Sequence, residues 1–129
     1  MEGSGTPINR IIVIGASNNR DKYGNKAVRA YAEKGYRVYP VNPKEERIEG
    51  IECYHSLKDI PEKVELASLY LPPEIGIRVI EDLPSAGVKK VYVNPGSESD
   101  DIIKRLKELK IEPLIVCSIV SIGRNPEDL

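Results

Sequence analysis

Five short apolar runs recur along the chain at intervals of about 20–30 residues. Most of them are apolar almost throughout and do not alternate between apolar and polar positions, as is typical of strands that are covered on both faces. A core made of Ile, Val, Leu and Ala, without Phe or Trp, also suits such strands. We therefore predict buried strands over residues 10–15, 37–41, 65–71, 90–94 and 113–117.

Amphipathic patterns with helical spacing fill three of the gaps, and they predict helices over 25–34, 73–83 and 98–110. Pro73 suits the first turn of the second helix, and Ser97 or Ser99 could cap the third. The remaining segment, 42–64, contains Gly50, Pro61 and a charged run. We predict that it is mostly loop, with a turn or two of helix around 56–60.

The alternation of strands and helices predicts an α/β fold, a single Rossmann-like, doubly wound parallel sheet of about five strands with helices on both faces. In such sheets, ligands bind outside the carboxyl ends of the strands. Residues 8–118 are predicted to form this domain, with a flexible N-terminus over 1–7 and a C-terminal tail over 119–129.

Composition excludes several classes of function. Lys and Arg number 19 and Asp and Glu 20, so the net charge of −1 argues against a general nucleic-acid binder. No stretch approaches the roughly 20 apolar residues of a membrane span. The polar N-terminus lacks the apolar middle of a signal peptide, so we expect a cytoplasmic protein. Cys53, Cys117 and the single His55 show no metal-ligand spacing, and no metal site is predicted.

The loop after the first predicted strand carries a candidate phosphate site. Glycine there lets the backbone turn sharply and approach a phosphate closely, and free N–H groups at a helix start complete an anion site. Any turn from a strand to a helix also needs a glycine, so an ordinary turn is the alternative. The candidate residues are Gly15, Ala16, Ser17 and Asn18, with Arg20 and Lys22 as nearby cations.

The loop departs from the dinucleotide fingerprint G-x-G-x-x-G. Many NAD-binding domains also place an acid at the end of the second strand to hold the ribose. Here no acid occurs there before Glu45, which points to a ligand other than NAD. Prolines follow three of the strands, over 42–43, 71–73 and 94–96, and predict stiff loops around a preformed cleft that suits an adenine ring. Plain strand termination is the alternative.

Four segments in this order and spacing carry a family resemblance, namely 14–17, 35–43, 54–62 and 94–99. Together they resemble the small stand-alone CoA-binding proteins with a Rossmann-like fold, which are related to the CoA-binding domains of acyl-CoA synthetases and of the succinyl-CoA synthetase α subunit. The resemblance covers roughly residues 8–120.

The resemblance implies a coenzyme A site with three parts. The pyrophosphate would lie on Gly15, Ala16, Ser17 and Asn18; the adenosine side would be lined by Val41, Asn42, Pro43 and Lys44; and Leu71, Pro72 and Pro73 would wall the adenine or the start of the pantetheine arm. Cys117 matches a cysteine of the family, although Ser118 follows it where relatives carry an acid within a few residues. A mixed disulfide between this thiol and CoA is a further hypothesis.

We expect a protein that binds CoA or an acyl-CoA without catalytic machinery of its own, because the phosphohistidine and ATP-closing domains of the larger relatives are not in this sequence. His55 is expected to have a surface or packing role. Two alternatives stay open: an NAD(P)-binding oxidoreductase or sensor, and a nucleotide-binding subunit of a separately encoded acyl-CoA synthetase. The sequence leaves open whether the chain forms a homo-oligomer and whether it binds a catalytic partner chain.

Overall fold

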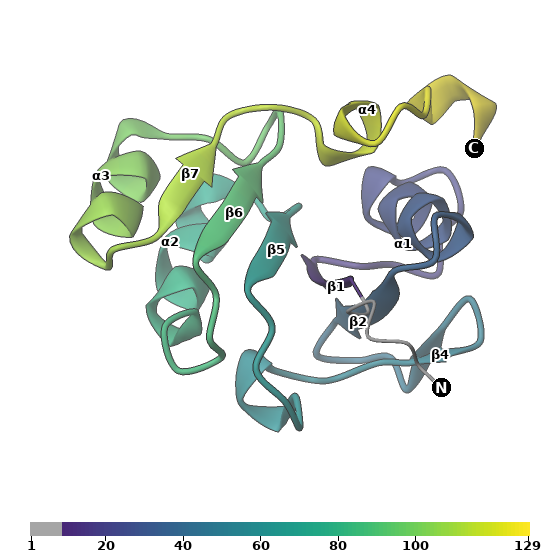
Figure 1. Cartoon of the computed structure of the whole chain (residues 1–129), viewed down its shortest axis with the longest axis horizontal. Helices are drawn as coiled ribbons and strands as arrows, with labels where there is room; N and C mark the ends of the chain where they lie inside the picture. The colour runs from purple at the N-terminus through teal and green to yellow at the C-terminus, as the bar shows by residue number, and fades with distance from the viewer. Residues whose placement is uncertain (1–8) are drawn as a thin grey trace, which may run out of the picture.

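The computed structural model describes residues 9–129 and contains one five-stranded parallel sheet (Figure 1). The α/β fold predicted from the sequence is confirmed. All four neighbouring pairs of strands run parallel, in the spatial order β2-β1-β5-β6-β7. The strands are β1 (Arg10–Ile14), β2 (Arg37–Val41), β5 (Leu66–Leu69), β6 (Lys90–Val93) and β7 (Glu112–Leu114).

Helices cover both faces of the sheet, which explains why the three strands β1, β2 and β5 are mostly buried and apolar. Along β1, Ile12 and Ile14 belong to one buried cluster, whereas Ile11 and Val13 belong to the other. The first cluster includes residues of α2 (Pro73–Val79) and α3 (Asp100–Glu108), and the second includes residues of α1 (Tyr23–Glu33) and α4 (Ser118–Ser121).

The three predicted helices are present with shifted ends. α1 begins two residues earlier than predicted, and α2 is followed by a 3₁₀ turn, η2 (Ile80–Asp82). Of the two candidate caps for α3, Ser99 is the one used, since its Oγ accepts a hydrogen bond from the N–H of Ile102 at 3.1 Å.

The segment between β2 and β5 differs from the prediction of a loop with a little helix. The expected helical turn is present as η1 (Leu57–Asp59), but a small hairpin precedes it, made of β3 (Arg47–Ile48) and β4 (Ile51–Glu52). Its turn places Glu49 at φ 52° and Gly50 at φ 77°, the left-handed pair that two-residue hairpins use. Strands of two residues show no readable alternation, and Asn usually stands where Glu49 does.

The C-terminal residues differ from the predicted tail. α4 contacts α1, the side chain of Ile119 is fully buried, and the hydroxyl of Tyr31 donates a hydrogen bond to the carbonyl oxygen of Ser118 at 2.7 Å. A last 3₁₀ turn, η3 (Pro126–Asp128), follows. The segment therefore packs on the α1 face of the domain. The predicted flexible N-terminus, 1–7, lies outside the described residues.

Within residues 9–129, no helix combines the length and the apolar character that crossing a membrane requires.

Candidate functional site

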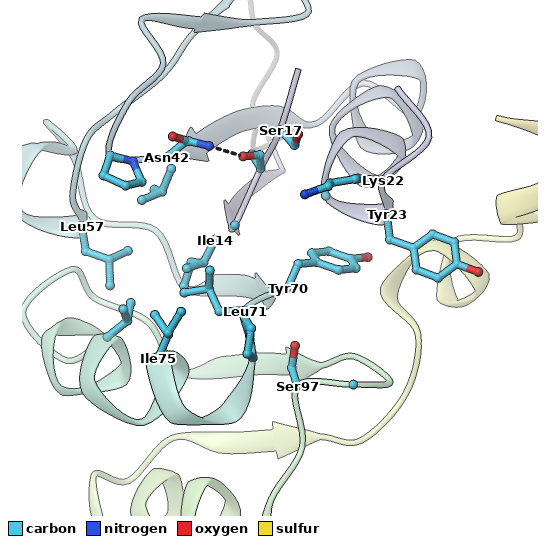
Figure 2. A pocket seen from close by; sticks show the side chains of 18 of the residues that line it. Ile14, Ser17, Lys22, Tyr23, Asn42, Leu57, Tyr70, Leu71, Ile75 and Ser97 are labelled. Atoms are coloured by element: carbon cyan, nitrogen blue, oxygen red, sulfur yellow. Dashed lines mark hydrogen bonds between the residues drawn. The ribbon is translucent and has the colours of Figure 1, made fainter. Parts of the chain in front are cut away.

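A cavity of about 1010 Å³ opens at the carboxyl ends of the central strands (Figure 2). Its volume is at the upper end of the range typical of small-molecule sites. The loops after β1, β2, β5 and β6 and the first turns of α1 and α2 form its walls. Of the predicted site residues, it is lined by Gly15, Ala16, Ser17, Lys22, Val41, Asn42, Pro43, Leu71 and Pro72. It is not lined by Asn18, Arg20, Lys44 or Pro73.

The loop after β1 packs too tightly for side chains at two positions. Gly15 has φ 88°, and a Cβ atom there would lie 2.8 Å from the carbonyl oxygen of Tyr70. A Cβ atom on Gly24, at the start of α1, would lie 2.2 Å from the carbonyl oxygen of Gly15. Both glycines are therefore required for the close approach of loop, strand end and helix start.

The backbone of this loop differs from a simple phosphate cradle. The N–H groups of Gly15 and Ala16 both donate to the carbonyl oxygen of Val41, at 3.1 and 3.2 Å, so they are not available to a ligand. The Asn42 side chain fixes the same turn, since its amide donates to the carbonyl oxygen of Ala16 at 2.9 Å (dashed line in Figure 2). Among the described residues, the N–H groups of Ser17 and Asn18 have no acceptor and remain available.

The start of α1 contributes the positive end of a helix to the cavity. Lys22 occupies the N-cap position, no side chain caps the helix, and the first turn carries no acid. The unsatisfied N–H groups of a helix N-terminus attract anions. Lys22 and Tyr23 line the cavity beside this end, and so does Lys26. The loop and the helix start therefore offer backbone and side-chain donors to a negatively charged group.

Two of the predicted ligand residues, Asn18 and Arg20, are instead bonded to the hairpin. The Asn18 amide donates to the carbonyl oxygen of Arg47 at 2.9 Å, and the Arg20 guanidinium donates to the carboxylate of Glu49 at 2.5 Å. The missed hairpin thus explains why these residues do not line the cavity. Through these hydrogen bonds, Asn18 and Arg20 attach the loop after β1 to the hairpin.

Asn25 connects the same hairpin to the loop. It is fully buried in α1, and its amide donates to the carbonyl oxygen of Ser17 at 2.9 Å and to the carboxylate of Glu49 at 3.0 Å. These hydrogen bonds from Asn25 and Arg20 hold the pKa of Glu49 below its ordinary value. Glu49 remains charged near neutral pH and fastens the loop to α1. We refer to Glu49, Arg20 and Asn25 as the hairpin brace.

The opposite end of the cavity is held by a buried network of neutral groups. Asn94, which follows β6, donates to the Ser68 hydroxyl at 2.8 Å and to the carbonyl oxygen of Leu69 at 2.9 Å. Its side-chain oxygen accepts the N–H of Ser118 at 2.8 Å. The Ser118 hydroxyl lies 2.8 Å from the hydroxyls of both Ser68 and Tyr70. We refer to Ser68, Tyr70, Asn94 and Ser118 as the hydroxyl network.

Tyr70 carries this network into the cavity wall, where Figure 2 shows its ring between Leu71 and Lys22. Burial raises the pKa of Tyr70 to about 12, although its hydrogen bonds to Ser118 and Ser68 act in the opposite direction. Burial also raises the pKa of Tyr31, whose hydroxyl is bonded to the Ser118 carbonyl. Both phenols are neutral hydrogen-bonding groups at physiological pH.

One side of the cavity is apolar. Leu57 from η1 and Ile75 from α2 line it, and Figure 2 shows Leu71 near them; Pro43 belongs to the same lining. Pro43 and Leu71 are among the residues predicted from the sequence, whereas Leu57 and Ile75 are not. Apolar positions in a short 3₁₀ turn and in the first turn of a helix resemble core positions, so the sequence offers no signal that they line a site.

His55 also lines the cavity, whereas the sequence analysis expects a surface or packing role for it. Its Nε2 atom lies 3.1 Å from a carboxylate oxygen of Glu46, and its side chain is half exposed. The ring therefore sits at the mouth, beside Ser56.

Among residues 9–129, the two carboxylates of the cavity wall are both distant in sequence from the end of β2. Asp21 lies before α1 and Asp82 in η2, whereas Val41, Asn42 and Pro43 form the wall at the end of β2. The position from which many NAD-binding domains hold the ribose is thus without an acid.

Cys117 does not end a strand as expected, because β7 ends at Leu114 and Cys117 precedes α4. Its thiol is free and half buried, and Cys117 is not part of the cavity lining. Cys53 is also free; it is buried, and burial raises the pKa of its thiol. Within residues 9–129, no group of three or more His, Cys, Asp or Glu side chains could hold a metal ion.

Comparison with known proteins identifies similar sequences. The model of a protein family described as "CoA binding domain" matches residues 9–127. The alpha subunit of the ADP-forming acetate–CoA ligase II of Pyrococcus furiosus is 38% identical over 84 residues, which are 64% of this chain. This chain spans only 18% of the length of that relative.

Solved structures share the fold. A conserved hypothetical protein of Pyrococcus furiosus is 35% identical, with a TM-score of 0.80, and the match covers 88% of this chain and 99% of that one. The dinucleotide-forming acetyl-coenzyme A synthetase 1 of Ca. Korarchaeum cryptofilum, in complex with phosphate and ADP, is 30% identical, with a TM-score of 0.73. That match covers 81% of this chain and 25% of the synthetase chain.

Proposed function

This chain belongs to the CoA binding domain family, and on that premise we propose that the cavity at the carboxyl edge of the sheet binds coenzyme A or an acyl-CoA. One observation carries the proposal. The available N–H group of Ser17, the uncapped start of α1 and Lys22 meet in one cavity whose β2 end lacks a carboxylate. This arrangement favours a phosphate-bearing ligand and lacks the usual ribose ligand of NAD sites.

The pyrophosphate lies, in this proposal, against Ser17, Lys22 and the first amides of α1. Gly15 and Ala16 contribute by allowing close approach, since their own N–H groups are bonded to Val41. Asn18 and Arg20 act from behind the loop through the hairpin and do not touch the ligand.

The adenosine lies, in this proposal, against Val41, Asn42 and Pro43 at the end of β2. Leu71 and Pro72 complete the wall, together with Leu57 and Ile75, which add apolar surface for a flat ring. Lys44 and Pro73 border this region without lining the cavity.

An NAD(P)-binding oxidoreductase or sensor is the alternative on the same fold. The lack of a carboxylate at the end of β2 disfavours NAD, because that acid commonly holds its ribose. NADP is not disfavoured in this way, because a cation holds its 2′-phosphate.

A role as the CoA-binding subunit of a larger enzyme has specific support. The relative that is 38% identical is named as a ligase alpha subunit, and this chain corresponds to 18% of it. In this second proposal a separately encoded chain supplies the catalytic groups. Co-purification of a tagged form with a ligase subunit, and CoA-dependent turnover only in the mixture, would support it; turnover by this chain alone would contradict it.

A matched pair of lysine variants tests the site. Lys22→Gln removes a cation from the cavity wall, and Lys44→Gln removes an exposed cation that does not line it. Losing one charge–phosphate contact of about 1 kcal/mol weakens CoA binding roughly fivefold to tenfold for Lys22→Gln, and Lys44→Gln changes it less than twofold. Isothermal titration with CoA measures both. Equal effects of the two variants would contradict the placement of the phosphate.

A further inference from the structure

The large apolar side chains that are exposed among residues 9–129 all gather at the carboxyl edge of the sheet. They are between 41% and 59% exposed, and they are Tyr23, Ile75, Ile115, Val116 and Val120. Elsewhere on the described part of the chain, large apolar side chains are buried or half buried. Exposed apolar surface concentrated beside a cavity marks a binding surface more often than scattered single residues do.

Four of these residues lie at the start of α1 and on the segment that leads from β7 into α4. Tyr23 begins α1 and lines the cavity, with its ring pointing away from the cavity centre in Figure 2. Ile115 and Val116 follow β7, and Val120 belongs to α4, which packs against α1. Figure 1 shows the segment between β7 and α4 running along the same edge of the sheet. We refer to Tyr23, Ile115, Val116 and Val120 as the apolar rim.

The order of the strands fixes which end of a CoA molecule would reach this rim. With the adenosine at the end of β2 and the pyrophosphate at the end of β1, the rest of the ligand continues over the ends of β5 and β6 toward β7. The pantetheine arm and its thiol therefore point toward the side of the cavity bordered by Tyr23 and Ser97, beyond which the rim lies. This step rests on the proposed function.

We propose that the apolar rim binds the acyl chain of an acyl-CoA, so that the preferred ligand is a thioester with a chain of several carbons and not free CoA. The four side chains of the rim carry no charge, although the Lys26 ammonium group lies 5.5 Å from the centroid of the Tyr23 ring. The rim offers methyl and methylene groups and the Tyr23 ring. A hydrocarbon chain needs such a surface and forms no hydrogen bonds.

A protein partner fits the rim less well. A stable protein interface usually involves about 20–30 residues on each side, whereas the rim consists of four. Its exposed neighbours Lys22, Ser121 and Gly123 add no apolar side chain that would extend it. A hydrocarbon chain is the occupant that continues from the proposed position of the pantetheine arm, and a second copy of the protein is an outcome of the variant test below.

Titration with CoA, acetyl-CoA, butanoyl-CoA and octanoyl-CoA tests the inference. Each methylene group that becomes buried strengthens binding about fourfold. With only part of the chain in contact, octanoyl-CoA is expected to bind at least tenfold more tightly than CoA, with a more negative heat-capacity change. Equal affinity along the series would overturn the inference while leaving CoA binding intact. If none of the four compounds binds, the proposed function itself fails.

A pair of double variants locates the effect. Val116→Ser with Val120→Ser removes apolar surface from the rim, whereas Val116→Ile with Val120→Ile keeps it; both positions are exposed, so both variants are expected to fold. The ratio of the CoA and octanoyl-CoA dissociation constants falls at least threefold in the serine variant and is kept in the isoleucine variant. An unchanged ratio in the serine variant would overturn the placement of the chain. A wild-type dimer that the serine variant dissociates would also overturn it, because the rim would then be an interface between copies.

Discussion

The two ends of the cavity are held by different kinds of interaction. At the β2 end, a charged and partly exposed carboxylate holds the glycine loop. At the β5 and β6 end, neutral groups that are fully or largely buried hold the wall. Glu49 of the hairpin brace is paired with Arg20, whose side chain is 61% exposed. Ser68, Asn94 and Ser118 of the hydroxyl network are at most 1% exposed.

The difference lies in how each arrangement responds to its surroundings. Exposed ion pairs are screened by salt and contribute little to stability, about 0–1 kcal/mol. Buried hydrogen bonds are insensitive to salt, and a buried group that loses its partner costs about 1–3 kcal/mol. We therefore expect the hydroxyl network to matter for folding, and the hairpin brace to matter mainly for the position of the phosphate-binding loop.

Asn94→Ala gives the largest expected effect of three changes that test this contrast. It leaves the N–H of Ser118 and the hydroxyl of Ser68 each short of a partner in the interior. We expect the free energy of unfolding to fall by about 2–4 kcal/mol, measured by urea denaturation. Asn9→Ala, at an exposed position, is the matched control and stays within about 0.5 kcal/mol. If Asn94→Ala lowered the free energy of unfolding by less than about 1 kcal/mol, the hydroxyl network would not contribute more to stability than the hairpin brace.

Glu49→Gln has a smaller expected effect on stability. The variant keeps the shape of the side chain but loses the charge that Asn25 and Arg20 bind. We expect a loss of about 0.5–1 kcal/mol at low salt, which shrinks as the salt concentration rises. Glu52→Gln makes the same charge change on the exposed strand of the same hairpin and serves as the control. If Glu49→Gln lowered the free energy of unfolding by more than Asn94→Ala does, the hairpin brace would contribute more to stability than the hydroxyl network, and the account would be contradicted.

The pH dependence of the Glu49 contribution is the smallest expected effect. The pKa of Glu49 is lowered in the folded protein, so the stabilisation is fully present above its unfolded pKa of about 4.3. It disappears as the pH falls through the lower folded-state pKa. The difference in unfolding free energy between wild type and Glu49→Gln should therefore be constant from about pH 5 to 7 and vanish in more acidic solution. A difference that grows as the pH falls would contradict the hydrogen bonding assigned to Glu49.

Much of the fold could be predicted because its signals are local. Four of the five strands coincide with apolar runs of the sequence, and each of the three long helices has its own apolar stripe. The fifth run, 113–117, was predicted less well, because β7 covers only Glu112–Leu114 and Ile115 and Val116 are exposed beyond it. Gly15 could be recognised as part of a candidate site because a glycine directly after a buried strand has a known structural use. The two-residue strands of the hairpin, by contrast, are too short to show a pattern.

The remainder of the site depends on contacts between distant parts of the chain. Arg20 looks like a ligand cation in the sequence, yet its partner Glu49 lies 29 positions away. Ser68 and Ser118 are separated by 50 positions, and nothing local in either segment indicates that their hydroxyls meet. The C-terminal residues were assigned to a tail for the same reason, since Ile119 is buried only because α4 packs against α1. Of the residues that the family resemblance implies, Asn18, Lys44 and Pro73 do not line the cavity.

The central claim is that the cavity is a CoA site, and parallel calorimetric titrations of the wild-type protein with CoA, NAD and NADP test it most directly. Before the titrations, the protein is denatured and refolded, and any small molecule released is identified. The account predicts that CoA or an acyl-CoA binds at least tenfold more tightly than either dinucleotide. The end of β2 offers no carboxylate to the ribose of NAD, and the loop after β1 departs from the dinucleotide fingerprint that NAD and NADP sites share. Tighter binding of NAD or NADP than of CoA would contradict it.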